Sequence, residues 1–187
     1  SIRVFVPGEK SAKVTIQVLG SNAKSFGTVV QQDVVAGRVA DIPISGLADG
    51  DYVAIVSSNV KIAASMNISR IVAGNNPVSD FAFLAAAEAS SNARTIRVPS
   101  SGISKLSFVN ADNKANRVNV KVNEKSISFE LSDAASRVIE AAPGSLVSFT
   151  STGPVAAAMV VDLNGAFTSL PITDYKNLAE KVLVSVR

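Results

Sequence analysis

The sequence predicts an all-β protein made of two tandem β-sandwich modules of the immunoglobulin-like kind. Apolar and polar residues alternate over strand-length segments, and Gly, Pro, Asn, Asp and Ser residues separate these segments at regular intervals. The same succession of segments returns about a hundred residues further along the chain, as an internal repeat would. We therefore place the first module at residues 1–92 and the second, its repeat, at residues 93–187.

Two alternating segments anchor the repeat. Lys13–Val18 carries valine or isoleucine at every second position, and Arg117–Val122 carries valine at the matching positions. In a strand these apolar side chains share one face, and the polar side chains between them share the other. Each segment is therefore expected to form a strand with one buried face and one solvated face.

Neighbouring segments extend the match. Phe5-Val6-Pro7 precedes the first anchor and Phe108-Val109-Asn110 precedes the second, each followed by a short polar turn, so both modules are expected to open with a hairpin. Further along, Ile62–Met66 matches Ala156–Val160, and both segments are small and apolar. Small side chains at these positions predict close packing between the two sheets of a sandwich.

The end of each module matches more loosely. Ala82-Phe83-Leu84 leads to Thr95–Val98 in the first module, and Ala166-Phe167-Thr168 leads to Val182–Val186 in the second. Between the strands of this last block, Asp162–Gly165 contains an Asn-Gly pair, which predicts a tight hairpin.

Two segments do not fit the strand pattern well. Residues 81–93 are rich in alanine, and Thr173–Lys181 has Tyr175, Leu178 and Val182 at helical spacing. Both segments occupy the same place, ahead of the final strand of a module. A short helical crossover in each module is therefore an alternative to irregular chain.

The composition limits the chemistry that the protein can perform. Hydrophobic residues make up 47% of the 187 residues and charged residues 18%, a balance typical of folded domains. The longest apolar run, Val155–Val161, is too short to span a membrane. With no Cys and no His, the chain cannot form disulfides, a Ser-His-Asp triad or a thiolate or imidazole metal site. We predict that the protein is not an enzyme and has no cofactor.

The net charge of +3 is too small and too evenly spread to indicate a nucleic-acid partner. One basic set, Lys114, Arg117, Lys121 and Lys125, lies within a short stretch and could contact phosphates. Its members also fit the solvated face of a strand, and no aromatic residue lies between them. We therefore expect a solvent face there and no nucleic-acid binding.

Asp49-Gly50-Asp51 leaves two interpretations open. Two carboxylates at this spacing could approach one Ca²⁺ ion, which takes several oxygen ligands. The same residues fit an Asp-Gly turn that leads into a strand at Tyr52. Because no further acidic residue follows nearby, and the second module has Pro143-Gly144-Ser145 in the matching place, we predict no metal site.

Two short motifs have weak chemical support. Ser21-Asn22-Ala23-Lys24 has the Ser-x-x-Lys spacing of penicillin-recognising enzymes, but that chemistry needs a helix behind the serine, and here the motif lies in a polar turn between strands. Asn67-Ile68-Ser69 fits the N-glycosylation pattern, which is common by chance. We therefore predict no catalytic residues.

The repeated blocks resemble a family of uncharacterised actinobacterial secreted proteins, a domain of unknown function that lies outside a membrane anchor. The resemblance rests on a strand ending in proline, Ile96–Pro99, on Leu106–Ala111 and the alternating Arg117–Val122, and on a Gly-Pro-Val-Ala-Ala segment at residues 153–157. Phe83 and Phe167 stand where such proteins often carry Trp. The resemblance implies an extracytoplasmic, membrane-tethered protein with β-modules, and it transfers no functional residues.

Together these observations predict a non-enzymatic structural or interaction module of a bacterial surface or secreted protein. The alternative is a module that binds a cell-wall glycan or a protein through loops at one end of a sandwich. The chain begins directly on the strand-like run Ile2–Val6, so we expect a processed or trimmed fragment, and whether a signal peptide or a membrane anchor precedes Ser1 stays open at this point.

Overall fold

The computed structural model describes residues 1–21, 27–72, 78–110, 112–163 and 166–174. Every regular element within these ranges is a β-strand, which confirms the predicted all-β class. The helical alternative is wrong for residues 81–93, because Phe81–Ala85 belongs to a strand and the rest is not helical. Of the other helical candidate, only Thr173 and Asp174 are described, and neither is helical. No helix in the described chain is long and apolar enough to cross a membrane.

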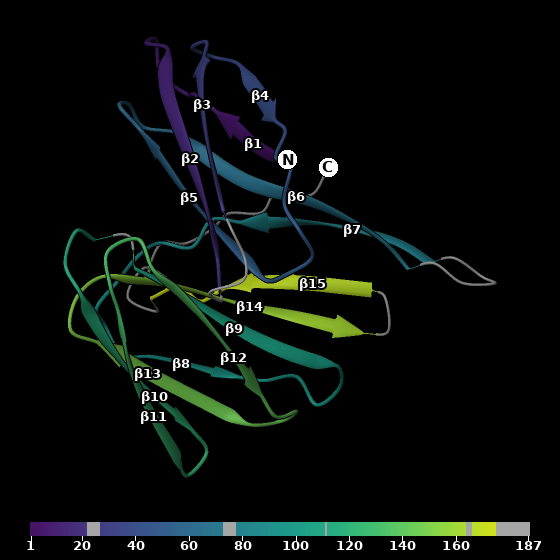
Figure 1. The fold of residues 1–187 in the computed structure, drawn as a ribbon, viewed down its shortest axis with the longest axis vertical. Helices are drawn as coiled ribbons and strands as arrows, with labels where there is room; N and C mark the ends of the chain where they lie inside the picture. Colours follow the sequence, from purple (N-terminus) through teal and green to yellow (C-terminus); the bar gives the residue numbers. More distant parts are fainter. Residues whose placement is uncertain (22–26, 73–77, 111, 164–165, 175–187) are drawn as a thin grey trace, which may run out of the picture.

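The first unit is a sandwich of two antiparallel sheets (Figure 1). Sheet A has the strand order β4-β1-β6-β7, and sheet B has the order β3-β2-β5. The strands are β1 (Ile2–Phe5), β2 (Ala12–Gly20), β3 (Thr28–Val34), β4 (Val39–Ile42), β5 (Tyr52–Ser58), β6 (Ala63–Val72) and β7 (Val78–Ala85).

A second sandwich follows, also built from antiparallel sheets. Sheet C has the order β12-β9-β14-β15, and sheet D has the order β11-β10-β13-β8. The strands are β8 (Arg94–Arg97), β9 (Ile103–Asn110), β10 (Asn116–Val122), β11 (Lys125–Leu131), β12 (Ser136–Ala141), β13 (Leu146–Ser151), β14 (Val155–Leu163) and β15 (Ala166–Pro171).

The two units arrange their strands in the same order. Sheet A becomes sheet C when β4, β1, β6 and β7 are replaced by β12, β9, β14 and β15. Sheet B likewise becomes sheet D, except that sheet D has one strand more, β8, beside β13. Each unit therefore places its strands in matching positions, and β8 is the main difference between them.

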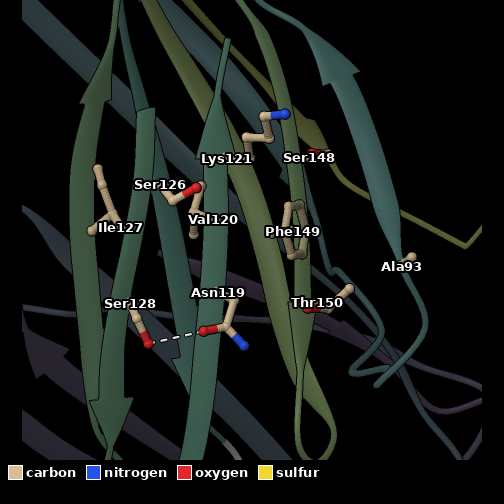
Figure 2. A pocket seen from close by; sticks show the side chains of 10 residues that line it. All are labelled: Ala93, Asn119, Val120, Lys121, Ser126, Ile127, Ser128, Ser148, Phe149 and Thr150. Atoms are coloured by element: carbon tan, nitrogen blue, oxygen red, sulfur yellow. Dashed lines mark hydrogen bonds between the residues drawn. The ribbon is translucent and has the colours of Figure 1, made fainter. Parts of the chain in front are cut away.

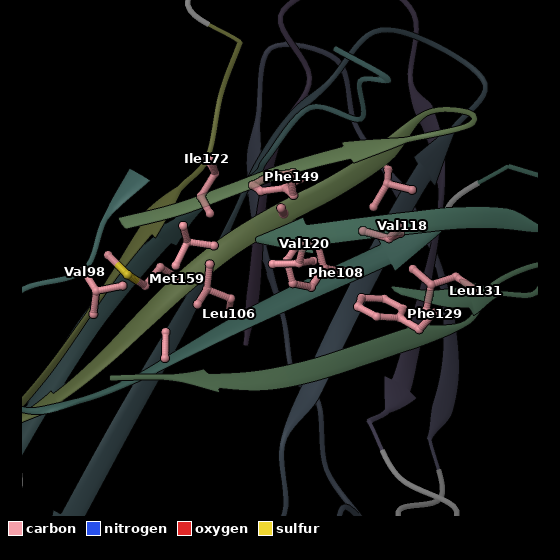
Figure 3. Packing of buried hydrophobic residues seen from close by; sticks show 14 of the residues in the cluster. Val98, Leu106, Phe108, Val118, Val120, Phe129, Leu131, Phe149, Met159 and Ile172 are labelled. Atoms are coloured by element: carbon pink, nitrogen blue, oxygen red, sulfur yellow. The ribbon is translucent and has the colours of Figure 1, made fainter. Parts of the chain in front are cut away.

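Each sandwich has its own apolar core, built from the alternating strands. In the second core the Phe108 ring meets Phe129 and Phe149 edge to face, with centroids 5.7 and 5.1 Å apart (Figure 3). Such aromatic pairs stabilise a core beyond the area they bury. The buried residues of the first core are Ile2, Val4, Val6, Ala12, Val14, Ile16, Val18, Val34 and Ile42.

The predicted opening hairpin is wrong in both units. β1 lies in sheet A and β2 in sheet B, while β9 lies in sheet C and β10 in sheet D. Residues 6–11 therefore cross from one sheet to the other, and Gly37 N donates to Val6 O at 2.8 Å to hold this crossing against a neighbouring loop. The crossing occurs because both strands turn their apolar faces toward the same core from opposite sides.

The sequence match around β1 was also displaced by one residue. Val4 on β1 and Phe108 on β9 are both fully buried on the core face, so Phe108 takes the place of Val4 and not of Phe5. Phe5 is 40% exposed on the outer face, whereas Phe108 is fully buried. Both segments contain Phe-Val, and aligning them on these residues gave the wrong register. A shift of one residue along a strand moves each side chain to the opposite face of the sheet.

Corresponding shifts affect the later blocks. Met66 pairs with Ile2 and Met159 with Leu106, so the two methionines correspond, one residue away from the match in the sequence. By contrast, the hairpin predicted at Asp162–Gly165 is confirmed, because β14 and β15 pair with Leu163 opposite Ala166. The Asn-Gly residues of that turn lie outside the described residues.

Two buried asparagines organise one end of the second unit. The Asn110 amide donates to the carbonyl oxygens of Lys114, Leu131 and Ser132 at 2.7–3.1 Å and accepts from Asn116 Nδ2 at 2.8 Å. A Cβ atom on Gly153 would lie 2.1 Å from Asn116 Oδ1, so any larger residue here would displace the Asn116 side chain. The amides satisfy loop carbonyls that would otherwise be buried without partners.

We expect Phe108→Ala to lower the free energy of unfolding by about 3–5 kcal/mol, because it leaves a cavity between two aromatic rings. Phe5→Ala, the matched control on the outer face, should cost less than about 1 kcal/mol. Urea denaturation followed by circular dichroism measures both. Equal losses for the two variants would contradict the register described above.

Candidate functional site

The surface between the two units is the first functional feature of the fold. β1 pairs with β6 over Ala63–Met66, and Ser1 pairs with Asn67; from residue 68 on, β6 runs beyond the N-terminal strand and pairs with β7. This part of the β6–β7 hairpin, which we call the overhang, lies against β15 of the second unit (Figure 1). The N-terminal unit thus covers the outer face of sheet C.

Charged side chains fix the position of the overhang. Arg70 Nη1 on β6 lies 2.5 Å from Asp162 Oδ2 on β14. Asp80 on β7 accepts a hydrogen bond from Phe167 N on β15 at 2.9 Å. The arginine and aspartate side chains remain 41% and 35% exposed, so solvent screens this ion pair. Its main effect is to select one alignment of the two units.

A second ion pair lies at the base of the first sandwich. Lys105 Nζ on β9 contacts the two carboxylate oxygens of Asp51 at 2.8 and 3.0 Å. Ser136 Oγ on β12 also donates to Gly20 O at 3.4 Å. Contacts at both the overhang and this base mean that the units meet at two separate places, which resists rotation of one unit about the other.

The segment that joins the units is held by Arg94, which is 1% exposed. Its guanidinium donates to Ser90 O and Val155 O at 2.7 Å and to Ile172 O at 3.3 Å, and it stacks over the Phe149 ring at 4.6 Å. Burial lowers the pKa of the Arg94 guanidinium, and the Asp174 carboxylate acts in the opposite direction. Arginine nevertheless stays charged at neutral pH because its ordinary pKa is so high.

The outer face of sheet A exposes aromatic side chains. Phe81 and Phe83 alternate on β7 with their rings edge to face, at 6.2 Å between centroids, and they are 66% and 50% exposed. We call this surface the aromatic face. Its exposed apolar residues are Phe5, Val39, Ile71, Phe81 and Phe83.

One ion pair lies within the aromatic face. Arg3 binds Asp41 through Nε and Nη2, both at 2.8 Å, and its guanidinium lies 5.3 Å from the centre of the Phe83 ring. The hydrogen bond from Arg3 holds the pKa of the Asp41 carboxyl below its usual range. Because Asp41 already neutralises this cation, the face suits an apolar or aromatic partner better than a phosphate.

An open hollow of about 390 Å³ lies on sheet D (Figure 2). Asn119 and Lys121 on β10 alternate with serine and threonine hydroxyls from β11 and β13, and Ser128 donates to Asn119 at 2.9 Å. These groups could hydrogen-bond a polar ligand. Among the lining residues none is acidic, so the hollow lacks the carboxylates that hydrolytic chemistry would use.

Of the two aspartates weighed as calcium ligands, Asp51 is engaged by other groups. Asp51 binds Lys105 of the second unit, and its carbonyl oxygen accepts from Ser21 N at 3.0 Å. Asp49 is exposed in the preceding loop. Across the described residues no three acidic side chains gather where they could hold a metal ion.

The other sequence motifs are dispersed. Ser21 ends the described part of its turn, and residues 22–24 of the Ser-x-x-Lys motif lie outside the described residues. Asn67 lies within β6, where its backbone pairs with Ser1. Arg117 and Lys121 lie on the outer face of sheet D, with Lys125 at the start of β11 and Lys114 in the loop before β10. The basic residues thus occupy the solvated face that the alternation predicts.

Loops also gather at the end of the first sandwich that lies away from the second unit (Figure 1). The chain segments are residues 6–11, 35–38 and 59–62. Val6 N donates to Arg38 O at 3.3 Å, and Lys13 N donates to the Asn59 side chain at 2.7 Å. These hydrogen bonds hold the loops together, so the loops form one surface. The alternative of a binding site built from loops at one end of a sandwich requires such a surface.

Sequence reasoning missed the contacts between the units and the aromatic face. The partners of the two ion pairs are separated by 54 and 92 residues, so no local pattern connects them. The aromatic face did leave a signal, because Phe81 and Phe83 are two positions apart, as residues on one face of a strand are. The surrounding alanines concealed it.

Comparison with known proteins confirms that the chain carries a domain of unknown function, which is the coarser part of the predicted resemblance. The sequence model of the family of unknown function DUF5719 matches residues 1–145. The chain therefore belongs to this family. The matched region contains the whole first unit, the junction and most of the second unit. Searches of curated proteins and of solved structures gave no match.

The pairing of Asp51 with Lys105 predicts a coupling between the units. Asp51→Lys and Lys105→Asp should each destabilise the protein, and the double variant should recover about 0.2–1 kcal/mol of the summed loss. Raising the salt concentration should reduce this coupling energy. A double-mutant cycle by urea denaturation measures it, and strictly additive losses would show that the pair does not couple the units.

Proposed function

We propose that this member of the DUF5719 family is a non-enzymatic structural module of a bacterial surface or secreted protein, in which two sandwiches act as one rigid body. The observation that carries the proposal is the docking of the overhang on β15 with its ion pair between Arg70 and Asp162. A spacer must hold its ends at a fixed separation. Two contact sites between the units and a fastened linker favour that property.

The side chains between the two units show a regular pattern of burial, which a flexible connection between the units would not produce. Along β7, residues that face β15 are partly buried, while the alternate residues are exposed. On β15, Phe167, Ser169 and Pro171 on the outer face of sheet C are partly buried as well. Relative motion of domains is the default where an interface is small. Here strand faces, ion pairs and the Arg94 junction act together against it.

The proposal includes the immunoglobulin-like identity of each sandwich and an origin by duplication. The identical strand order of sheets A and C, and of sheets B and D apart from β8, supports both. The number of strands and the two-sheet packing fit immunoglobulin-like domains. In both units the connection between the first two strands of the shared order crosses from one sheet to the other. This shared connection also supports an origin by duplication.

A non-catalytic role is supported by the side chains on the surface. Asp41 and Asp51 are each engaged by a cation, and the hollow on sheet D is lined by hydroxyls, an amide and an amine. The absence of His and Cys from the sequence adds to this argument. The extracytoplasmic location is supported by the resemblance of Ile96–Pro99, Arg117–Val122 and residues 153–157 to secreted proteins.

A binding function is the second candidate, and the aromatic face favours it. Exposed phenylalanines are enriched where proteins meet other proteins, and contiguous apolar patches often mark such sites. The exposed apolar residues described on this face are phenylalanine, valine and isoleucine, so a protein partner fits it better than a cell-wall glycan. The loops at the end of the first sandwich offer a separate surface for the glycan alternative.

We expect the two units to tumble together in solution. Backbone ¹⁵N relaxation should give one rotational correlation time for both units, and X-ray scattering should fit the single compact arrangement of Figure 1. A variant with Arg70→Ala, Lys105→Ala and Asp80→Ala should show two different times. A single shared time in that variant would remove the role assigned to these contacts, and separate times in the native chain would refute the rigid spacer.

The extracytoplasmic part of the proposal is tested separately by cell fractionation of the native protein. Recovery from the surface or the medium is expected. Recovery from the cytosol alone would contradict it while leaving the rigidity result intact.

For the second candidate, we expect Phe81→Ser with Phe83→Ser to abolish capture of a protein partner from a lysate of surface proteins. The control is Val29→Ser, which removes an apolar side chain that is 61% exposed on sheet B. Both variants should keep the native unfolding transition, because the substituted side chains are solvent exposed. Undiminished capture by the double variant would exclude the aromatic face as the binding surface.

A further inference from the structure

The exposed apolar side chains of the aromatic face form two groups on the outer side of sheet A. Phe5 on β1 and Val39 on β4 are opposite one another in the sheet, and we call them the Phe5 group. Phe81 and Phe83 on β7, with Ile71 on β6, form the Phe81 group, in which Ile71 is 75% exposed. Because β4 and β7 stand at opposite ends of the strand order, the two groups lie on opposite sides of the face.

Short side chains on β6 separate the two groups. Phe5 is opposite Ala63 on this strand, whereas Phe81 is opposite Ser69, further along the same strand. At the rise of a β-strand, these positions are separated by about 20 Å. The outer residues of β6 in this interval are Ala63, Ser65, Asn67 and Ser69. Along β6 the face therefore leaves room for the larger side chains of a partner.

The ion pair of Arg3 and Asp41 lies between the two groups. Arg3 precedes Phe5 on β1, and its guanidinium reaches to 5.3 Å from the centre of the Phe83 ring. The two charged side chains are 43% and 48% exposed, so a partner can contact both. No other outward side chain among the described residues of β1, β4, β6 and β7 is charged. This surface is thus neutral, with one cation and one anion side by side.

A surface of this kind is complementary to itself. In a two-fold contact each copy uses the same patch, so a residue that touches another is touched by that other residue in return. With the axis between the two groups, the Phe5 group of each copy meets the Phe81 group of the other. The two ion pairs then come together near the axis, where each Arg3 can bind the Asp41 of the other copy. Apolar side chains are buried, and all four charges have opposite neighbours.

A second copy explains the pattern better than an unrelated partner does. Contiguous exposed apolar surface, rich in phenylalanine, is typical of protein interfaces. An unrelated protein would need apolar side chains against both groups and an ion pair of its own at the matching place. The chain already carries that arrangement. Because the surface has no net charge, two copies also approach one another without repulsion there.

We propose that the aromatic face is the contact surface of a two-fold dimer of this chain. The ion pairs of Arg3 and Asp41 lie at its centre, and the Phe5 group of each copy packs against the Phe81 group of the other. This dimer rests on the second candidate function, which gives the aromatic face a protein partner, and it makes that partner a second copy. Because the same patch is used on both sides, the assembly closes at two copies.

Charge reversal tests whether the two ion pairs meet. In sedimentation, the average mass of the native chain should rise with concentration to that of two chains and no further. Arg3→Asp leaves two carboxylates on the face and Asp41→Arg leaves two guanidinium groups, so either variant alone should dimerise at least about tenfold more weakly. An equimolar mixture of the two variants should recover the dimer, because an acidic face then meets a basic one. A folding defect in either variant would not be repaired by mixing.

The matched control lies on the outer face of sheet B. Lys13 on β2 is opposite Asp33 on β3, and both are exposed. Lys13→Asp and Asp33→Lys therefore change the charge by the same amounts away from the aromatic face. Each control variant should dimerise as the native chain does.

Four results would overturn the dimer. A chain that stays monomeric at every concentration would do so, and if it still captured a different protein through Phe81 and Phe83, the second candidate function would stand without it. Growth beyond two copies would show that the contact is not two-fold. A dimer that both charge reversals leave intact would place the contact elsewhere. A loss that mixing does not repair would show that the charges of the two copies do not meet.

Discussion

The buried guanidinium of Arg94 is the interaction on which the junction of the two units depends. Moving a charge out of water is costly unless every donor that can be satisfied finds an acceptor. Here Nη1 and Nη2 find carbonyl oxygens in the linker, at the start of β14 and in the chain that leaves β15, while Nε is buried with no hydrogen-bond partner among the described residues. Because the fork of donors on a guanidinium is rigid, these three segments can meet only in one arrangement. The Phe149 ring completes the site and connects the junction to the second core.

Because the junction is fixed, weak contacts between the units are enough to set their relative orientation. Each exposed ion pair contributes little stability by itself. Once the linker is held, however, Arg70 and Asp162 no longer have to find one another by diffusion of a loose domain, and small energies are enough to select one orientation. The aromatic face then has a defined direction relative to the second unit. A partner bound there would be presented at a constant angle.

The alternating strands, above all β2 and β10, could be predicted from the sequence because alternation is a local property of residues two positions apart. Sheet membership could not, since whether a turn forms a hairpin or crosses a core depends on distant strands. The register between the two units was predicted wrongly for a related reason. Phe5 and Phe108 are the same residue type, but Phe5 lies on the outer face of its sheet and Phe108 on the core face. Alanine-rich residues 81–93 suggested a helix, yet Phe81 and Phe83 use the alternation of a strand. The ion pairs between units join residues too far apart for any local pattern, and they define the candidate site more than any predicted motif does.

The overhang also has a consequence for how the protein is made. During synthesis the N-terminal part of a chain emerges from the ribosome first and begins to fold there. The inner side of β7, with Ala82, lies against β15, which is the last of the described strands to emerge. The first sandwich therefore keeps an uncovered strand surface until residues 166–171 have been translated. A ribosome that stops early releases a product that proteases and chaperones can recognise as unfinished, so the order of translation provides a check on the completeness of the molecule.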